Sequence, residues 1–355
     1  MNTTDPISAI SGAIESAENA REVGMLTIKV ANNALLDASR RPNPDELYHS
    51  LWFEGEVGCL FADSNLGKSI YAVQIAEYIA QERPVLYLDC ELSEKQFQLR
   101  YTDKDTHLLH QFPPRFFRAE INPSAIDPDK YEDKILKDIE AAMLATGCKT
   151  GIIDNISYLC NATDKGLEAG KFMMKLMNLK KQYGWSLLII AHTPKRSLSS
   201  PITQNDLGGS KKLYNFFDSV MAIGQSAKDE RLRYVKQLKI RSGEQEYGSG
   251  NILVYEISHE GGFVHFQFVE FGKESEHLRD RTDEAREVER NNIAELRSQG
   301  KSVRQIASFL GISKSKVDRI IKTLEPVPSQ EDAGQEGREG QVGQQSLFEN
   351  QEEEK

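Results

Sequence analysis

A short segment containing glycine, lysine and serine constrains this chain more than any other feature. It follows the apolar run Gly58 to Phe61 and precedes a helical stretch, Ile70 to Ile79. A tight loop between a strand and a helix directs backbone N–H groups at phosphate oxygens. The segment is therefore predicted to bind the phosphates of a nucleotide. Its residues are Ala62, Asp63, Ser64, Asn65, Leu66, Gly67, Lys68 and Ser69.

Three residues of this loop have distinct expected roles. Lys68 would reach the β- and γ-phosphates, and the hydroxyl of Ser69 would bind Mg²⁺. Ala62 stands where the motif has its first glycine. Because alanine adds only a methyl group, we expect the loop to form. The alternative is a chance glycine-lysine-serine at a helix start, but the preceding strand and the following helix disfavour it.

Five short apolar runs predict a mostly parallel sheet. They are rich in β-branched or large apolar residues and show little alternation, as expected of strands buried on both faces. Helical stretches near 68–81, 132–145 and 168–183 separate them, which implies βαβ units and an α/β fold. Two later runs, 233–238 and 262–266, alternate better and are expected to add antiparallel strands at one edge. The five runs are Gly58–Phe61, Val85–Leu88, Thr150–Ile153, Ser186–Ile190 and Val220–Ile223.

Asp154 directly follows one of these buried runs, Thr150 to Ile153. Ligands bind at the edge of a parallel sheet where the strands end. A carboxylate there is predicted to hold Mg²⁺ together with Ser69, as the second acidic element of phosphate-binding enzymes does. The alternative is an aspartate that only caps the next turn.

The segment Tyr87-Leu88-Asp89-Cys90-Glu91 resembles a strand end of the RecA-like P-loop ATPases, where the catalytic glutamate stands. The resemblance implies that Glu91 orients and polarises the attacking water, with Asp89 as its rival. The alternative is a pair of solvated acids. The run Ile189 to Thr193 resembles the strand that ends in a γ-phosphate sensor, which implies a catalytic role for His192. A lone histidine is otherwise often structural.

A further resemblance concerns Leu238-Lys239-Ile240-Arg241. It is similar to the lysine-x-arginine pattern that supplies an arginine finger to a neighbouring subunit in ring ATPases. This implies catalytic roles for Lys239 and Arg241, and the alternative is a solvated strand edge. Over Trp52 to Phe271 the chain most resembles the small hexameric replicative helicases of plasmids and mobile elements. The same core also serves recombination and protein-clock ATPases.

The resemblance implies ATP and Mg²⁺ as cofactors, a homohexamer, and single-stranded DNA in a central channel. Two loops, 161–171 and 195–209, would face that channel. In the second, Lys195 and Arg196 are expected to contact DNA, since basic side chains suit a groove that follows the backbone. The alternative is that both are ordinary mobile loops.

The basic unit at 291–325 is predicted to be a helix-turn-helix. Gly300 ends a first helix, Ser302 opens a capping box for a second, and Gly311 marks the turn before a last helix. The unit resembles the DNA-binding unit of resolvases. The last helix would contact duplex DNA, and the alternative is a small helical bundle for protein contact. Its expected DNA-binding residues are Lys314, Lys316 and Arg319.

The expected organisation has five parts. Residues 1–47 form an N-terminal helical extension, 48–272 the RecA-like ATPase domain, 273–290 a charged linker or helix, 291–325 the helix-turn-helix and 326–355 a disordered acidic tail. Within the tail, Gln344-Gln345-Ser346-Leu347-Phe348 resembles the peptides by which bacterial replication proteins hold the sliding clamp. The alternative is a solubilising tail.

Composition narrows the function classes. The net charge of −10 argues against a uniformly basic surface but not against a local basic groove. No apolar run approaches the ~20 residues of a membrane span, and the N-terminus lacks a secretory pattern. The four cysteines show no short paired spacing, which favours free thiols in the cytoplasm.

Two functions fit these observations. The first is an ATP-driven DNA motor, a hexameric replicative-type helicase or a related DNA-processing ATPase of a mobile element or plasmid. The alternative is a DNA-binding regulator or loader in which ATP switches assembly without strand separation. A strand-displacement measurement separates the two.

Overall fold

The computed structural model describes residues 21–126, 131–159, 166–193, 196–207 and 211–324. The chain divides into two compact units, Met1–Asp280 and Arg281–Lys355, and each is described by itself. Within the described residues no helix is both long and apolar enough to cross a membrane. The cysteines in this part, Cys59, Cys90 and Cys148, are free thiols, and Cys160 lies outside it.

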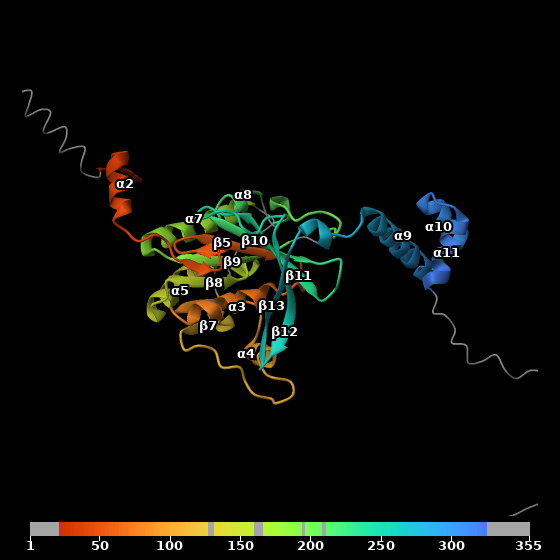
Figure 1. The fold of residues 1–355 in the computed structure, drawn as a ribbon, viewed down its shortest axis with the longest axis horizontal. Coiled ribbons are helices and arrows are strands. Elements are labelled where there is room, and N and C mark those ends of the chain that lie inside the picture. Colours follow the sequence, from red (N-terminus) through yellow and green to blue (C-terminus); the bar gives the residue numbers. More distant parts are fainter. Residues whose placement is uncertain (1–20, 127–130, 160–165, 194–195, 208–210, 325–355) are drawn as a thin grey trace, which may run out of the picture. The chain divides into compact units, whose positions relative to one another are not determined.

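A nine-stranded sheet forms the centre of the first unit (Figure 1), in the order β13-β12-β11-β10-β5-β9-β8-β6-β7. The six strands from β10 to β7 are parallel to one another. Five of them correspond to the five predicted runs, and the α/β fold with a mostly parallel sheet is confirmed. The parallel strands are β5 (Val57–Ala62), β6 (Val85–Asp89), β7 (Phe116–Glu120), β8 (Thr150–Asp154), β9 (Ser186–His192) and β10 (Ser219–Gln225).

Helices cover both faces of this sheet. On one face α3 (Lys68–Ala80) packs through Tyr71 and Ile75, and on the other α5 (Tyr131–Thr146) and α7 (Gly166–Tyr183) pack through residues such as Met143 and Phe172. Every residue of β5, β6 and β8 is buried. Burial on both faces explains why these strands are continuously apolar. The shorter helices are α4 (Glu94–Arg100), α6 (Ile156–Leu159), α8 (Lys211–Tyr214) and the 3₁₀ turns η1 (Pro123–Ala125) and η3 (Gln204–Asp206).

Three antiparallel strands extend the sheet beyond β10. They are β11 (Leu232–Lys239), β12 (Ile252–Glu260) and β13 (Phe263–Gly272). The two expected runs fall in β11 and β13, whereas β12 was not predicted. The parallel edge strand β7 was also missed, because its sequence Phe-Phe-Arg-Ala-Glu is half polar and its burial is only partial.

The described part of the expected N-terminal helical extension, residues 21–47, combines short strands with a helix. It contains a hairpin of β1 (Arg21–Val23) and β2 (Leu26–Ile28), turning at Gly24 with φ 60°, before the single helix α2 (Ala31–Ser39). The short strands β3 (Glu46–Tyr48) and β4 (Trp52–Phe53) then join the ATPase core, where Tyr48 and Trp52 are buried.

The segment 273–290, expected to be a charged linker or helix, is divided between the two units. The 3₁₀ turn η4 (Glu274–His277) belongs to the first unit, where Glu274 is buried and forms an ion pair with Lys236 at 2.5 Å. The second unit begins within the expected linker, since α9 runs from Arg281 to Ser298.

The second unit consists of α9, α10 (Val303–Leu310) and α11 (Lys314–Leu324) around a small core of its own. Ser302 caps α10 in the predicted capping box with Gln305, and Gly311 ends that helix at φ 68°. The predicted C-terminal helix-turn-helix unit is therefore confirmed. Its core residues are Ile293, Leu296, Ile306, Ala307, Val317 and Ile321.

Candidate active site

Four parallel strands end together at one edge of the sheet. Ala62 ends β5 beside His192 at the end of β9, and Asp89 ends β6 beside Asp154 at the end of β8. Since β9 lies between β5 and β8, the residues that follow these ends are brought close together. This is the edge where α/β sheets bind ligands.

The predicted phosphate-binding loop joins β5 to α3. Gly67 has φ 91°, and a Cβ there would lie 2.9 Å from the Phe266 ring, so both the backbone and the space require glycine. Lys68 is buried, and its Nζ donates to the carbonyls of Ala62 at 3.0 Å and Asp63 at 2.8 Å. Burial lowers the pKa of Lys68, and the nearby Asp154 and Glu91 carboxylates oppose that shift.

Asp154 is almost fully buried beneath this loop. Tyr87 donates its hydroxyl to Asp154 Oδ2 at 2.7 Å, and Ser69 also forms a side-chain hydrogen bond with the carboxyl. Desolvation raises the pKa of Asp154, while these hydrogen bonds act in the opposite direction. A bound cation would offset the cost of burying the charge.

Ser69 and Asp154 together fit a Mg²⁺ site. Magnesium is held by one or two carboxylates, substrate phosphates and several waters rather than by a cage of protein ligands. Among the described residues there is no cluster of three or more acidic, histidine or cysteine ligands. A divalent ion here would therefore take its remaining ligands from phosphate and water.

Glu91, Asn155 and His192 form a polar cluster beside the loop. His192 Nε2 lies 2.8 Å from Asn155 Nδ2 and 3.3 Å from Glu91 Oε1, and Asn155 also donates to Glu91 Oε1. The hydrogen bond with His192 lowers the pKa of Glu91, burial opposes this, and Lys68 adds to the lowering. Such a group can orient and polarise a water molecule as a carboxylate.

Asn155 was not among the residues expected from the sequence. It is fully buried and contacts both Glu91 and His192. The sequence gives one indication of its role: Asn155 is an amide residue that directly follows Asp154, at the end of a buried strand. That indication is weak, because the two contacts join it to residues 64 and 37 positions away.

Asp89, the rival to Glu91, is engaged elsewhere. Its Oδ1 accepts the backbone N–H groups of Glu91 at 3.1 Å and Leu92 at 2.9 Å, and its Oδ2 accepts from Arg118. The Asp89 side chain is 1 % exposed, against 33 % for that of Glu91. Of the two acids, Glu91 is therefore the one that can reach a ligand.

Lys239 and Arg241 lie at the opposite edge of the sheet. Lys239 pairs with Val220 near the start of β10, and Arg241 donates to Asp218 Oδ1 at 2.9 Å. Asp218 also accepts the backbone N–H of Val57 at the start of β5, whereas the phosphate-binding loop follows its end. Arg241 therefore does not reach the loop of its own chain.

The expected DNA contacts of the ATPase unit are only partly described. Lys195, residues 161–165 of the first loop and residues 208–209 of the second lie outside the described residues. The Arg196 side chain is 11 % exposed, and its guanidinium lies 3.7 Å from Asp206 and hydrogen-bonds with Tyr234. These internal partners leave the Arg196 side chain mostly buried.

The helix-turn-helix unit does expose the expected basic residues on α11. Lys314, Lys316 and Arg319 are all exposed. Lys316 forms an ion pair with Glu289 of α9 at 2.7 Å, so one of the three is already paired. The clamp-like peptide Gln344–Phe348 lies outside the described residues.

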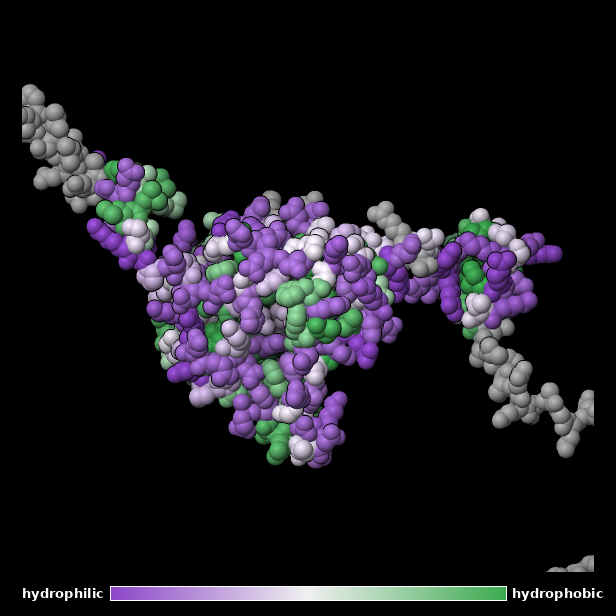
Figure 2. Space-filling view, viewed as in Figure 1, coloured by the Kyte–Doolittle hydropathy of each residue, from purple (hydrophilic) through white to green (hydrophobic). Residues whose placement is uncertain are grey.

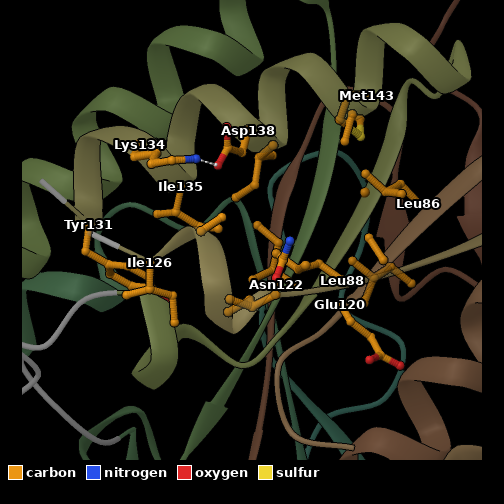
Figure 3. A pocket seen from close by; sticks show the side chains of 18 of the residues that line it. Leu86, Leu88, Glu120, Asn122, Ile126, Tyr131, Lys134, Ile135, Asp138 and Met143 are labelled. Atoms are coloured by element: carbon orange, nitrogen blue, oxygen red, sulfur yellow. Dashed lines mark hydrogen bonds and ion pairs between the residues drawn. The ribbon is translucent and has the colours of Figure 1, made fainter. Parts of the chain in front are cut away.

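An apolar cavity of about 200 Å³ lies away from this site, between α5 and the sheet (Figure 3). Leu86 and Leu88 of β6 and Ile135 and Met143 of α5 line it. None of Lys68, Glu91, Asp154 or His192 is among its lining residues. Its walls offer few polar groups, so it does not suit a phosphate ligand.

Comparison with known families agrees with this geometry. A family model described as an AAA domain matches residues 20–197, just over half of the 355 residues. The matched range contains Lys68, Glu91, Asp154, Asn155 and His192. A second model, described as a helix-turn-helix domain, matches residues 287–322. No curated protein matches the chain with significant similarity. The chain therefore belongs to the AAA domain family of P-loop ATPases, and it carries a DNA-binding helix-turn-helix domain beyond its ATPase unit.

Proposed function

We propose that this protein is an ATP-driven DNA motor, a hexameric helicase of the replicative type or a related DNA-processing ATPase. One observation carries the proposal. Lys68, Glu91, Asp154, Asn155 and His192 converge at one edge of the sheet, in a chain that also has a DNA-binding domain. A chain that both hydrolyses ATP and binds DNA can use the free energy of hydrolysis to move along DNA or to remodel it.

The proposed roles follow from the contacts. Lys68 exchanges its two carbonyl partners for phosphate oxygens, a stronger charge-assisted interaction. Ser69 and Asp154 hold Mg²⁺, which neutralises charge on the phosphates when bound. Glu91 orients a water molecule and accepts its proton. His192, linked to Glu91 through Asn155, senses the γ-phosphate.

In this proposal, a second copy of the chain completes the active site. Arg241 cannot serve its own loop, but its side chain is 56 % exposed and could leave Asp218 for a neighbour's nucleotide. Lys239, whose Nζ lies 5.1 Å from the Tyr214 ring centroid, stands beside it. An arginine supplied in this way stabilises the charge of the transition state.

The N-terminal arm, defined as residues 21–39, supports assembly into an oligomer. Neither its hairpin nor α2 buries a residue within the described part of the chain. Apolar side chains gather over α2 in Figure 2. A contiguous exposed apolar surface is typical of a protein contact. Its most exposed apolar residues are Val23, Met25, Leu26, Ile28, Leu35 and Leu36.

Mixing subunits tests whether sites are shared. We expect Arg241→Ala and Glu91→Gln chains each to hydrolyse ATP slowly when they assemble alone. Mixed oligomers, whose composition is verified by native mass spectrometry, should recover part of the activity, because some interfaces pair an intact Arg241 with an intact Glu91. Mixed oligomers without any recovery would exclude sharing.

The runner-up is an ATP-switched regulator or loader that does not separate strands. The internal partners of Arg196 favour it, since a motor needs basic groups facing its DNA track. The test measures ATP hydrolysis with single-stranded and with duplex DNA, and displacement of a strand from a forked duplex, with Lys68→Ala as control. A motor is stimulated most by single strands and unwinds the fork. Hydrolysis without displacement would favour the regulator.

A further inference from the structure

The turn that carries Glu91 is braced by a buried ion pair. Arg118 of β7 donates from Nη2 at 2.8 Å and from Nε at 3.1 Å to Asp89 Oδ2. The two side chains are 15 % and 1 % exposed. The other oxygen of Asp89 accepts the backbone N–H groups of Glu91 and Leu92. One carboxylate therefore joins the edge strand to the backbone of Glu91 itself.

Arg118 also holds the far side of this turn. Its Nη2 donates to the carbonyl of Leu92 at 2.7 Å, and its guanidinium carbon lies 4.5 Å from the centre of the Phe97 ring on α4. Ser93 caps α4 in a capping box with Gln96. The turn is thus fixed between the end of β6 and the start of α4, with Arg118 in contact with both sides.

We infer that Arg118 is a positioning residue for Glu91, acting through Asp89 and Leu92. The inference rests on the proposed role of Glu91 in activating water. Arg118 contacts the turn on which Glu91 stands. It restricts the backbone from which the Glu91 side chain reaches Asn155 and His192, and a displacement of about 1 Å in a reacting group can cost roughly 10² in rate.

The chemistry of the contact requires arginine. A single planar group serves Asp89, the Leu92 carbonyl and, through Nη1, Glu120. A lysine at this position would keep the positive charge near Asp89. It would lose the fixed fork that bridges a carboxylate and a carbonyl. Arg118→Lys therefore tests whether the positive charge beside Asp89 is sufficient or whether the planar guanidinium is required.

The experiment compares Arg118→Lys and Asp89→Asn with the full-length protein, measuring kcat and KM for ATP, affinity for a fluorescent ATP analogue, and thermal unfolding. For both variants we expect kcat to fall by roughly 10- to 100-fold, while nucleotide affinity changes by no more than about twofold. Asp89→Asn keeps an oxygen for the backbone N–H groups, so it remains informative if Arg118→Lys does not fold. Arg115→Lys is the matched control, since the Arg115 side chain is exposed and donates to the carbonyl of Gln81 at 2.9 Å, away from the turn that carries Glu91.

A double-mutant cycle distinguishes positioning from a general structural role. Because Arg118 acts through Glu91, Arg118→Lys should cost little further activity in a Glu91→Gln background. The inference would be overturned if the losses of activity caused by Arg118→Lys and Glu91→Gln were fully additive. It would also be overturned if nucleotide affinity fell by as large a factor as kcat. A folded Arg118→Lys protein with the wild-type rate, while Glu91→Gln is slow, would overturn it as well. If Glu91→Gln itself hydrolyses at the wild-type rate, the proposed function fails first and the inference falls with it.

Discussion

The two units of this chain hold their functional residues in opposite ways. In the ATPase unit Lys68, Asp154 and Asn155 are buried and tied to fixed partners, whereas in the helix-turn-helix unit Lys314 and Arg319 stand exposed on α11. Stabilising charge on a reacting phosphate requires preorganised groups shielded from water. Binding a polyanion requires only mobile positive charges at a surface. Substitutions should therefore have large effects in the first unit and graded, salt-dependent effects in the second.

Lys68→Ala should produce a larger effect than any substitution in the second unit. Loss of a preorganised charged donor is expected to reduce ATP hydrolysis by on the order of 10²–10³. Binding of duplex DNA without nucleotide should stay within about twofold, because the helix-turn-helix unit has its own core. The two quantities are measured on the same preparation. A wild-type rate of hydrolysis would refute the assignment of the loop.

Replacing Lys314, Lys316 and Arg319 together by alanine should have a smaller, salt-dependent effect. Each lost phosphate contact is expected to reduce the slope of log affinity against log salt by about one. Titration of a duplex with a fragment of residues 281–326, at several salt concentrations, measures that slope. A fragment that binds with no salt dependence, or not at all, would indicate a unit for protein contact.

The buried charge of Asp154 should limit the stability of the protein without Mg²⁺. Burial raises its folded-state pKa above the ordinary 3.8. Stability is therefore lost as the pH rises from about that value through the folded-state pKa, and the loss is complete above it. At pH 7 without Mg²⁺, Asp154→Asn should unfold a few degrees higher than wild type, at roughly 2–4 °C per kcal/mol.

Two controls sharpen this test. The difference in unfolding temperature should shrink as the pH falls from 7 toward the ordinary value of 3.8, because the wild-type carboxyl takes up a proton over that range. Mg²⁺ with nucleotide should stabilise the wild type more than the variant. An Asp154→Asn protein that unfolds at a lower temperature at pH 7 would show that the carboxylate is not strained by burial.

Glu289→Gln should have the smallest effect. The change frees Lys316 from its 2.7 Å partner and removes a negative charge beside α11. Exposed pairs are worth about 0.2–1 kcal/mol, so duplex affinity should rise by a factor between about 1.4 and 5. Gel-shift or anisotropy titration against Lys316→Ala in the same background checks whether the gain depends on Lys316.

Local patterns predicted the scaffold of both units but not the partners of individual side chains. The phosphate-binding loop and the turn at Gly311 depend on neighbours in sequence, so they could be predicted. The sequence favoured Glu91 over its rival Asp89, but the ion pair that engages Asp89 could not be predicted, because its partner Arg118 lies 29 residues away on an unpredicted strand. The hydrogen bond between Arg196 and Tyr234 also joins residues that are distant in the sequence, although the run containing Tyr234 was predicted.

The rate of ATP hydrolysis by Glu91→Gln, measured together with nucleotide affinity, tests the central claim most directly. The amide keeps the shape of the side chain but cannot accept a proton from water. The account predicts nucleotide binding within about twofold of wild type and hydrolysis slower by roughly 10²–10⁴, the usual contribution of a positioned base. Equal rates for the two proteins would contradict it and return Asp89 to consideration.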